Sequence, residues 1–157
     1  MEPVMSDALE LSVTTYIECP PEKVWDVLAN RQEEWWCPKP WRVQIDHQDR
    51  RAGGRCAMTM HGPNGEVMPN EGIYLAYEQG KRFVVTDAVS VDDAGDFVPA
   101  GPFMVGFWEI APEGSGTRYT GRAKHWTVET MQQHQAMGFK EGWGTVAEQL
   151  KALCEAG

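Results

Sequence analysis

The chain has 157 residues, of which 42% are hydrophobic, and its net charge is −9. This length suits one packed core, so we expect a single domain over 1–157 with its folded part at about 8–155. The negative charge argues against binding to nucleic acid or to an anionic membrane surface. No apolar run approaches the roughly 20 residues that span a bilayer, so we expect no membrane insertion.

The N-terminus and the cysteines indicate the cellular compartment. The opening sequence MEPVMSDALELSV lacks the basic and apolar segments of a signal peptide. The four cysteines show no CxxC spacing and lie far apart, at Cys19, Cys37, Cys56 and Cys154. We therefore expect a reduced, cytoplasmic protein.

The first part of the chain predicts one strand and two short helices. Residues 8–18 alternate between apolar and polar side chains, which is typical of a strand. The segment CPPEKVWDVLAN predicts a helix, because two prolines and a glutamate suit its first turn. A second helix, RQEEWW, should end before Pro38, since proline disfavours the helical conformation in the residue that precedes it.

The middle of the chain predicts strands that follow one another across short turns. The segments WRVQIDHQDRR and RCAMTMH are strand candidates, and GPNG between RCAMTMH and the next strand is a turn. Residues 92–101 are expected to form a loop. An antiparallel meander follows from these two strands and the further candidates at 71–79, 81–91, 102–111 and 117–126.

The last segment predicts one long helix from Thr127, a good N-cap, to about Cys154. It would span about 28 residues, or roughly 42 Å. A helical wheel places Gln135 near the centre of the buried face and Gly138 and Gly142 on its flank. The apolar stripe of that face contains Val128, Phe139, Val146, Leu150 and Leu153, with Trp143 and Met131 at its margins.

The polar and small side chains of this stripe favour a space under the first half of the helix. An amide is costly in a sealed apolar core unless it is hydrogen-bonded, and glycines remove side-chain volume. Close packing of a bulky neighbour against Gly138 and Gly142 is the alternative. Gly144 faces the opposite side of the wheel and has no evident reason to be glycine.

Strand alternation predicts which side chains point inward. Met58 and Met60 share a face with Cys56. Tyr119 and His125 oppose the face of Arg118, Arg122 and Lys124, which we expect to be solvated. The other strand residues expected inside are Ile73, Leu75, Phe83, Val105 and Phe107, and Trp35 and Trp36 should close the mouth.

Six segments occur in a characteristic order and spacing: PPEKVWDVL, EEWWCP, RAGGRCAMTMHGPNGE, EGIYLAYEQGKRFVVTD, GTRYT and H…MGFKEGW. They resemble the family related to the C-terminal domain of the activator of the heat-shock-protein-90 ATPase, within the START-like, Bet v 1-like (SRPBCC) superfamily. The resemblance covers about residues 8–155. It implies an α+β helix-grip fold, in which a curved antiparallel sheet of six or seven strands wraps around a long C-terminal helix. It also implies a pocket between sheet and helix. Because the implied fold fills the given sequence, we expect the chain to resemble the stand-alone bacterial members, without a separate chaperone-binding domain.

We expect the protein to bind a hydrophobic or amphipathic small molecule in that pocket. Two alternatives stay open: a cyclase- or dehydratase-type enzyme, which needs His125 and Gln135 at one cavity, and a module that stimulates a chaperone ATPase. A homodimer is also left open. The candidate ligand-binding residues are Trp35, Trp36, Met58, Met60, Phe83, Phe107, Tyr119, His125, Met131, Gln135, Gly138 and Trp143.

The sequence supports no catalytic residue, metal site or cofactor. The four histidines have no ligand spacing with the cysteines. There is also no nucleophile elbow and no glycine-rich phosphate loop. We therefore favour binding over catalysis. Both polar candidates also have a structural alternative to ligand contact. His125 could cap the junction of the last strand and the helix, and Gln135 could form a hydrogen bond to the backbone or to a water.

Overall fold

The computed structural model describes residues 9–156 and has the predicted α+β architecture. Seven strands form one antiparallel sheet in the order β1-β9-β8-β5-β4-β3-β2. Its strands are β1 (Glu10–Ile17), β2 (Arg42–Gln48), β3 (Arg55–His61), β4 (Val67–Glu78), β5 (Arg82–Thr86), β8 (Met104–Glu113) and β9 (Gly116–His125). Ala8, which the prediction places in the first strand, lies outside the described residues.

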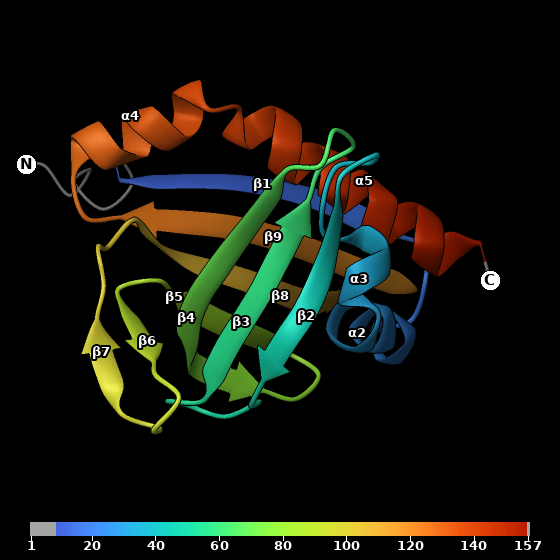
Figure 1. Ribbon diagram of the computed structural model, residues 1–157. Helices are drawn as coiled ribbons and strands as arrows, with labels where there is room; N and C mark the ends of the chain where they lie inside the picture. The colour runs from blue at the N-terminus through green and yellow to red at the C-terminus, as the bar shows by residue number, and fades with distance from the viewer. Residues whose placement is uncertain (1–8, 157) are drawn as a thin grey trace, which may run out of the picture.

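The predicted meander is confirmed with one change. The strand expected at 81–91 is divided into β5 and β6 (Val89–Val91). The stretch expected to be a loop contains β7 (Phe97–Pro99), which pairs with β6 in a separate hairpin. This hairpin stands beside one end of the main sheet (Figure 1).

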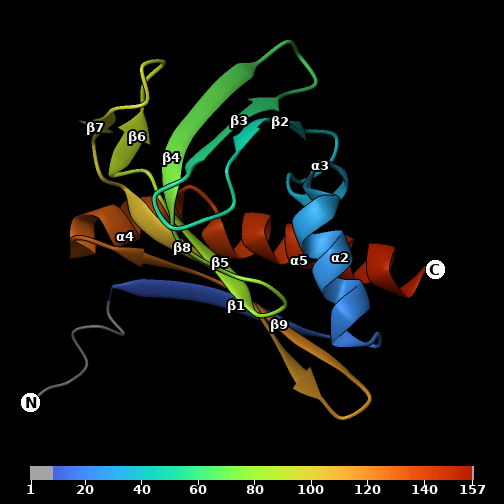
Figure 2. The same cartoon turned by 90° about the horizontal axis from the view of Figure 1, so that it is seen from below.

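Two short helices follow β1, as predicted. Helix α2 (Pro21–Asn30) begins with proline at its first position, where the missing N–H needs no partner. Its buried face includes Val24 and Leu28. Helix α3 (Gln32–Trp35) ends shortly before Pro38. Figure 2 shows α2 and α3 together at one end of the sheet, across α5.

The C-terminal segment is two helices, and the predicted single helix is wrong. Helix α4 (Val128–Ala136) and helix α5 (Phe139–Glu155) meet at Gly138. The φ angle of Gly138 is 96°, a left-handed conformation that glycine adopts at little cost and that ends a helix. The predicted N-cap is present, because Thr127 Oγ1 accepts a 3.1 Å hydrogen bond from the amide of Thr130.

The core is packed between the sheet, α2 and the second half of α5. Ile17, Leu28, Leu150 and Cys154 have no exposed surface there. Among residues 9–156, no helix is long and apolar enough to cross a membrane.

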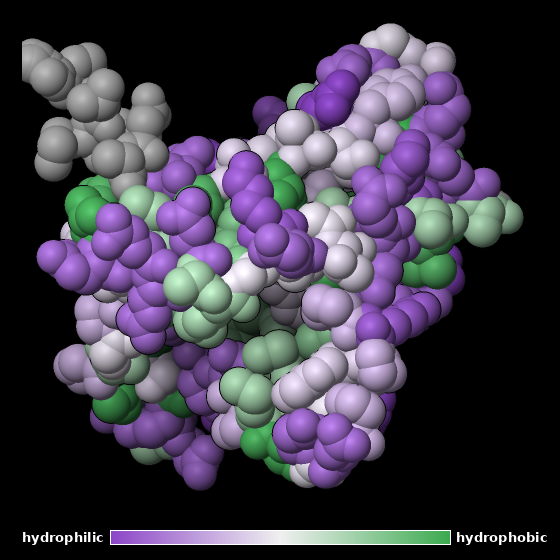
Figure 3. Space-filling view, turned by 90° about the horizontal axis from the view of Figure 1, so that it is seen from above, coloured by the Kyte–Doolittle hydropathy of each residue, from purple (hydrophilic) through white to green (hydrophobic). Residues whose placement is uncertain are grey.

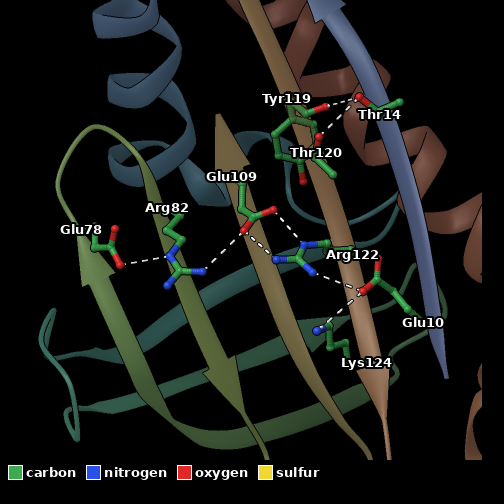
Figure 4. Close-up of polar contacts among 9 residues, drawn as sticks. All are labelled: Glu10, Thr14, Glu78, Arg82, Glu109, Tyr119, Thr120, Arg122 and Lys124. Carbon is green, nitrogen blue, oxygen red and sulfur yellow. Dashed lines mark hydrogen bonds and ion pairs between the residues drawn. The ribbon is translucent and has the colours of Figure 1, made fainter. Parts of the chain in front are cut away.

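The opposite face of strands β8 and β9 carries charged side chains, as predicted for Arg118, Arg122 and Lys124. The guanidinium of Arg122 binds both carboxylate oxygens of Glu109 at 2.8 and 2.9 Å, and it reaches Glu10 at 3.2 Å. Figure 4 shows this row of ion pairs running across the strands. The side chains of Arg122 and Glu109 are 22% and 24% exposed, so solvent screens this pair only in part.

Candidate functional site

A cavity of about 550 Å³ lies between the sheet and the C-terminal helices. This volume is within the range of roughly 300–1,000 Å³ that is usual for small-molecule sites. Figure 3 shows a hollow on the helix side of the molecule, with hydrophobic residues beside it. Its apolar lining includes Trp35, Trp36, Met58, Met60, Met68, Phe83, Val85, Phe103, Met104, Trp108, Met137, Trp143 and Val146.

Three tryptophans form the wall toward the sealed core. The ring of Trp143 stacks on Trp108 at 5.4 Å between centroids and meets Trp36 edge-on at 5.2 Å. Trp108 in turn stacks on Phe83 at 5.3 Å. Gly106 makes this possible, because a Cβ there would stand 2.6 Å from the Trp108 ring. The wall is therefore a continuous aromatic layer.

Methionines form much of the rest of the lining. Met60 on β3 faces Met68 on β4, and Met104 comes from β8. Met68 and Met137 are 50% and 68% exposed, so the cavity meets solvent at these two side chains. Unbranched thioethers adapt to ligands of different shape. The lining can therefore change shape more readily than one made of branched side chains.

The polar side chains of the lining are mostly bonded within the protein. Thr86 Oγ1 donates to the carbonyl of Met104 at 3.1 Å. Asp87 Oδ1 accepts from the amide of Phe103 at 2.9 Å, and Glu71 pairs with Arg55 at 3.1 Å. Within the described part of the chain, none of the lining residues is Lys or Arg. The cavity therefore offers no cation to an anionic ligand.

Two histidines form a buried hydrogen-bonded pair at the end of the cavity near α4. Nε2 of His125 lies 2.9 Å from Nδ1 of His134, and Nδ1 of His125 lies 2.9 Å from the carbonyl oxygen of Leu9. His134 lines the cavity and also packs against Phe103, with ring centroids 4.8 Å apart. Burial, reinforced by the neighbouring His125, lowers the pKa of His134 to about 4. The ring of His134 is therefore neutral near pH 7.

Several of the predicted site residues lie together around the cavity. They are Trp35, Trp36, Met58, Met60, Phe83 and Trp143. Gly142 also lines the cavity, and a Cβ added to it would have no atom within 4 Å, as the wheel suggested for this flank. Contact of these residues with a ligand stays a prediction.

Phe107 does not line the cavity, and the inward assignment of Phe107 and Val105 is wrong. The inward row of β8 is Gly106, Trp108 and Ile110. Phe107 pairs with Arg122 across the strands, and the guanidinium carbon of Arg122 lies 4.0 Å from its ring centroid. Glu109 lies two residues after Phe107 and so points to the same face of the strand. A glutamate is expected to face solvent, and this could have identified the outer face. On β4, Leu75 is likewise outside, 46% exposed beside a β-bulge.

Three other candidates are wholly or partly buried without lining the cavity. Tyr119 is completely buried and contacts Trp35 edge-on at 6.2 Å. Met131 is half-buried against the core. His125 reaches the cavity only through His134, since both of its ring nitrogens are bonded.

The predictions for the first part of the C-terminal segment are wrong at three positions. Gln135 and Val128 are exposed rather than buried. Gly138 lies at the break between helices and does not line the cavity. The break explains all three. The helical wheel assumed one continuous helix, whereas the left-handed Gly138 rotates the buried face of α4 relative to that of α5. The pairing of His125 with Gln135 at one cavity, which the enzyme alternative requires, is therefore not present.

Sequence reasoning missed four major parts of the lining. They are Phe103, Met104, Trp108 and His134. For Trp108 the strand parity of Glu109 was the available signal. For His134 the helical periodicity gave no signal, and its place in the segment H…MGFKEGW was the only one available.

Comparison with known proteins supports the family resemblance that the sequence segments indicate. The profile of the family described as Activator of Hsp90 ATPase homolog 1-like protein matches residues 18–155. A crystal structure of a protein from Nitrosomonas europaea is 34% identical, with 95% of this chain and 96% of that chain covered and a TM-score of 0.84. No protein of curated function matches the chain.

More distant structures share the fold. A Mycobacterium smegmatis protein is 26% identical, with coverage of 96% and 94% and a TM-score of 0.78. An AHSA1 protein from Silicibacter pomeroyi is 18% identical, with coverage of 94% and 98% and a TM-score of 0.70. The resemblance inferred from the six sequence segments and the helix-grip fold are both confirmed. The chain belongs to the family of Activator of Hsp90 ATPase homolog 1-like proteins.

Proposed function

We propose that the protein binds a hydrophobic or amphipathic small molecule in the cavity between the sheet and helices α4 and α5. The observation that carries this proposal is the cavity itself, about 550 Å³ in volume and lined by tryptophan and methionine side chains. A fold selected only for stability would fill this space, because burial of apolar surface stabilises by about 25 cal/mol per Å².

The alternatives have less support. The enzyme alternative needs His125 and Gln135 at one cavity, whereas both ring nitrogens of His125 are bonded and Gln135 is exposed. Stimulation of a chaperone ATPase is suggested by the family description alone. We therefore favour binding without catalysis.

The thiols are consistent with the expected reducing, cytoplasmic compartment. Cys19, Cys37, Cys56 and Cys154 are all buried and unpaired. Burial raises the pKa of Cys56 to about 11 and that of Cys154 to about 12, so neither is a ready nucleophile.

Two glycines of α5 provide a direct test of cavity binding. Gly142 lines the cavity and Gly144, two residues later, does not, while neither has an atom within 4 Å of an added Cβ. Leucine is a good helix former, so Gly142→Leu and Gly144→Leu should both fold. Circular dichroism checks that they do.

The neutral dye Nile red serves as the probe, with tryptophan fluorescence as a second signal. We expect saturable binding to the wild type, unchanged within about twofold in Gly144→Leu. A Leu side chain in the cavity should weaken binding at least about tenfold in Gly142→Leu, equivalent to about 1.4 kcal/mol. Absence of saturable binding to the wild type, or equal binding by both variants, would overturn the proposal.

A further inference from the structure

Among residues 9–156, His134 is the only histidine of the lining, and one of its ring nitrogens has no hydrogen-bond partner. It is 7% exposed, and its only hydrogen bond there uses Nδ1. Glu71 and Asp87, the carboxylates of the lining, are bonded to Arg55 and to backbone amides. The free nitrogen of His134 is Nε2, which a five-membered ring directs away from Nδ1 and therefore away from His125.

The hydrogen-bond chain determines what Nε2 can do. The carbonyl oxygen of Leu9 can only accept, so Nδ1 of His125 carries a hydrogen and donates it. With His125 neutral, its Nε2 has a lone pair and accepts from the Nδ1–H of His134. Nε2 of His134 then carries a lone pair and no hydrogen.

The surroundings favour the neutral state of His134. The pair is buried, and within the described chain no carboxylate is hydrogen-bonded to either ring. A buried charge without a partner is costly. The low pKa of His134 agrees with this.

We propose that Nε2 of His134 is a fixed hydrogen-bond acceptor for a hydroxyl or amide N–H of a neutral, apolar ligand. This rests on the proposed function, since it assigns the ligand class of the same cavity. His125 is a positioning residue, which sets the tautomer of His134 through Leu9. A free fatty acid fits poorly, because its carboxylate would meet a lone pair in a cavity without Lys or Arg and beside Glu71 and Asp87.

Three matched probes distinguish the ligand classes: 1-decanol, its methyl ether and decanoate. They share one alkyl chain and differ in having a hydrogen-bond donor, no donor, or a negative charge. We expect decanol to bind the wild type about 2- to 10-fold more tightly than the ether, the worth of one neutral hydrogen bond. Decanoate should bind more weakly than decanol.

Two variants of His134 separate acceptance from packing. The amide of asparagine occupies the place of Nδ1, so His134→Asn can still donate to His125 but has no atom at the place of Nε2. It should lose the preference for decanol over the ether, whatever its affinity for the ether. The amide of glutamine reaches the place of Nε2, so His134→Gln should recover part of the preference.

Nitrogen NMR of the ¹⁵N-histidine-labelled protein reports the protonation of Nε2 directly. A purely structural role of His134 would not make this signal depend on decanol. Nε2 of His134 should give the signal of an unprotonated nitrogen, which shifts on addition of decanol and not of the ether. Equal binding of decanol and ether, tighter binding of decanoate, or a protonated Nε2 would overturn the inference while leaving cavity binding intact. Failure of all three probes and of Nile red would instead contradict the proposed function.

Discussion

The two ends of the interior differ although one sheet forms both. At the end near α2, Ile17, Leu28, Leu150 and Cys154 leave no exposed surface. At the end near α4, the same sheet faces a cavity, with methionines and a histidine where the other end has branched aliphatic side chains. The protein is thus divided into a part that supplies stability and a part that forgoes burial to keep space.

The junction between these ends is made by side chains that belong to both. Trp143 lines the cavity and also packs against Phe139, with 4.7 Å between the ring centroids. Gln149 closes the sealed end, where its amide nitrogen donates to the carbonyls of Trp35 and Cys37 at 2.9 and 2.8 Å. Substitutions at the end near α2 should therefore change stability, and substitutions at the end near α4 should change ligand affinity.

The largest expected effect is on stability at the sealed end. Leu150→Ala removes a fully buried side chain and should lower the free energy of unfolding by about 2–5 kcal/mol in urea denaturation. Met60→Ala, in the cavity wall, should cost less than about 1.5 kcal/mol, because no close packing is lost on the cavity side. Equal costs for the two would show that the ends do not differ as described.

The second effect is on the pH dependence of stability. Unfolded histidine takes up a proton near pH 6.5, whereas folded His134 does so only near pH 4. The unfolded state therefore binds more protons between these values, so stability falls as the pH decreases through this window. The destabilisation by His134 is absent above pH 6.5 and reaches its full, constant value below pH 4.

His134→Asn should remove this contribution and reduce the loss of stability between pH 6.5 and pH 4 by about 1–3 kcal/mol. Urea denaturation at a series of pH values measures it. His47→Asn, at an exposed position on β2, is the matched control and should follow the wild-type curve. Parallel curves for wild type and His134→Asn would contradict the buried neutral state.

The smallest effect separates two glycines that look alike in the sequence. Gly138 has a φ of 96°, so Gly138→Ala should destabilise by about 1–2 kcal/mol. Gly144 lies inside α5 with open space around its Cα, so Gly144→Ala should stabilise by about 0.5–1 kcal/mol. Thermal unfolding gives both signs. No destabilisation by Gly138→Ala would show that the left-handed break between α4 and α5 is not required, and destabilisation by Gly144→Ala would contradict the open space at that position.

Nothing in the structure requires glycine at 144. At Gly142 the same open space is part of the cavity. The comparison shows why a cluster of glycines in a sequence cannot be given one explanation: one ends a helix, one keeps space and one has no structural reason.

The sequence by itself determined the order of elements, the antiparallel sheet and the row Cys56, Met58, Met60 that faces the cavity. These follow from local alternation, prolines and turns, which act within a few residues. The family also followed from the sequence, because six segments in register specify the fold.

Only the tertiary structure decided the end of the site near α4. The left-handed Gly138 changes the direction of the chain, so no periodicity drawn through it can tell that His134 is buried and Gln135 exposed. The bond between His125 and His134 joins a strand to a helix, and the carbonyl that sets both tautomers comes from Leu9, 116 positions earlier than His125. Such contacts depend on how elements pack, which the local pattern of a sequence does not contain.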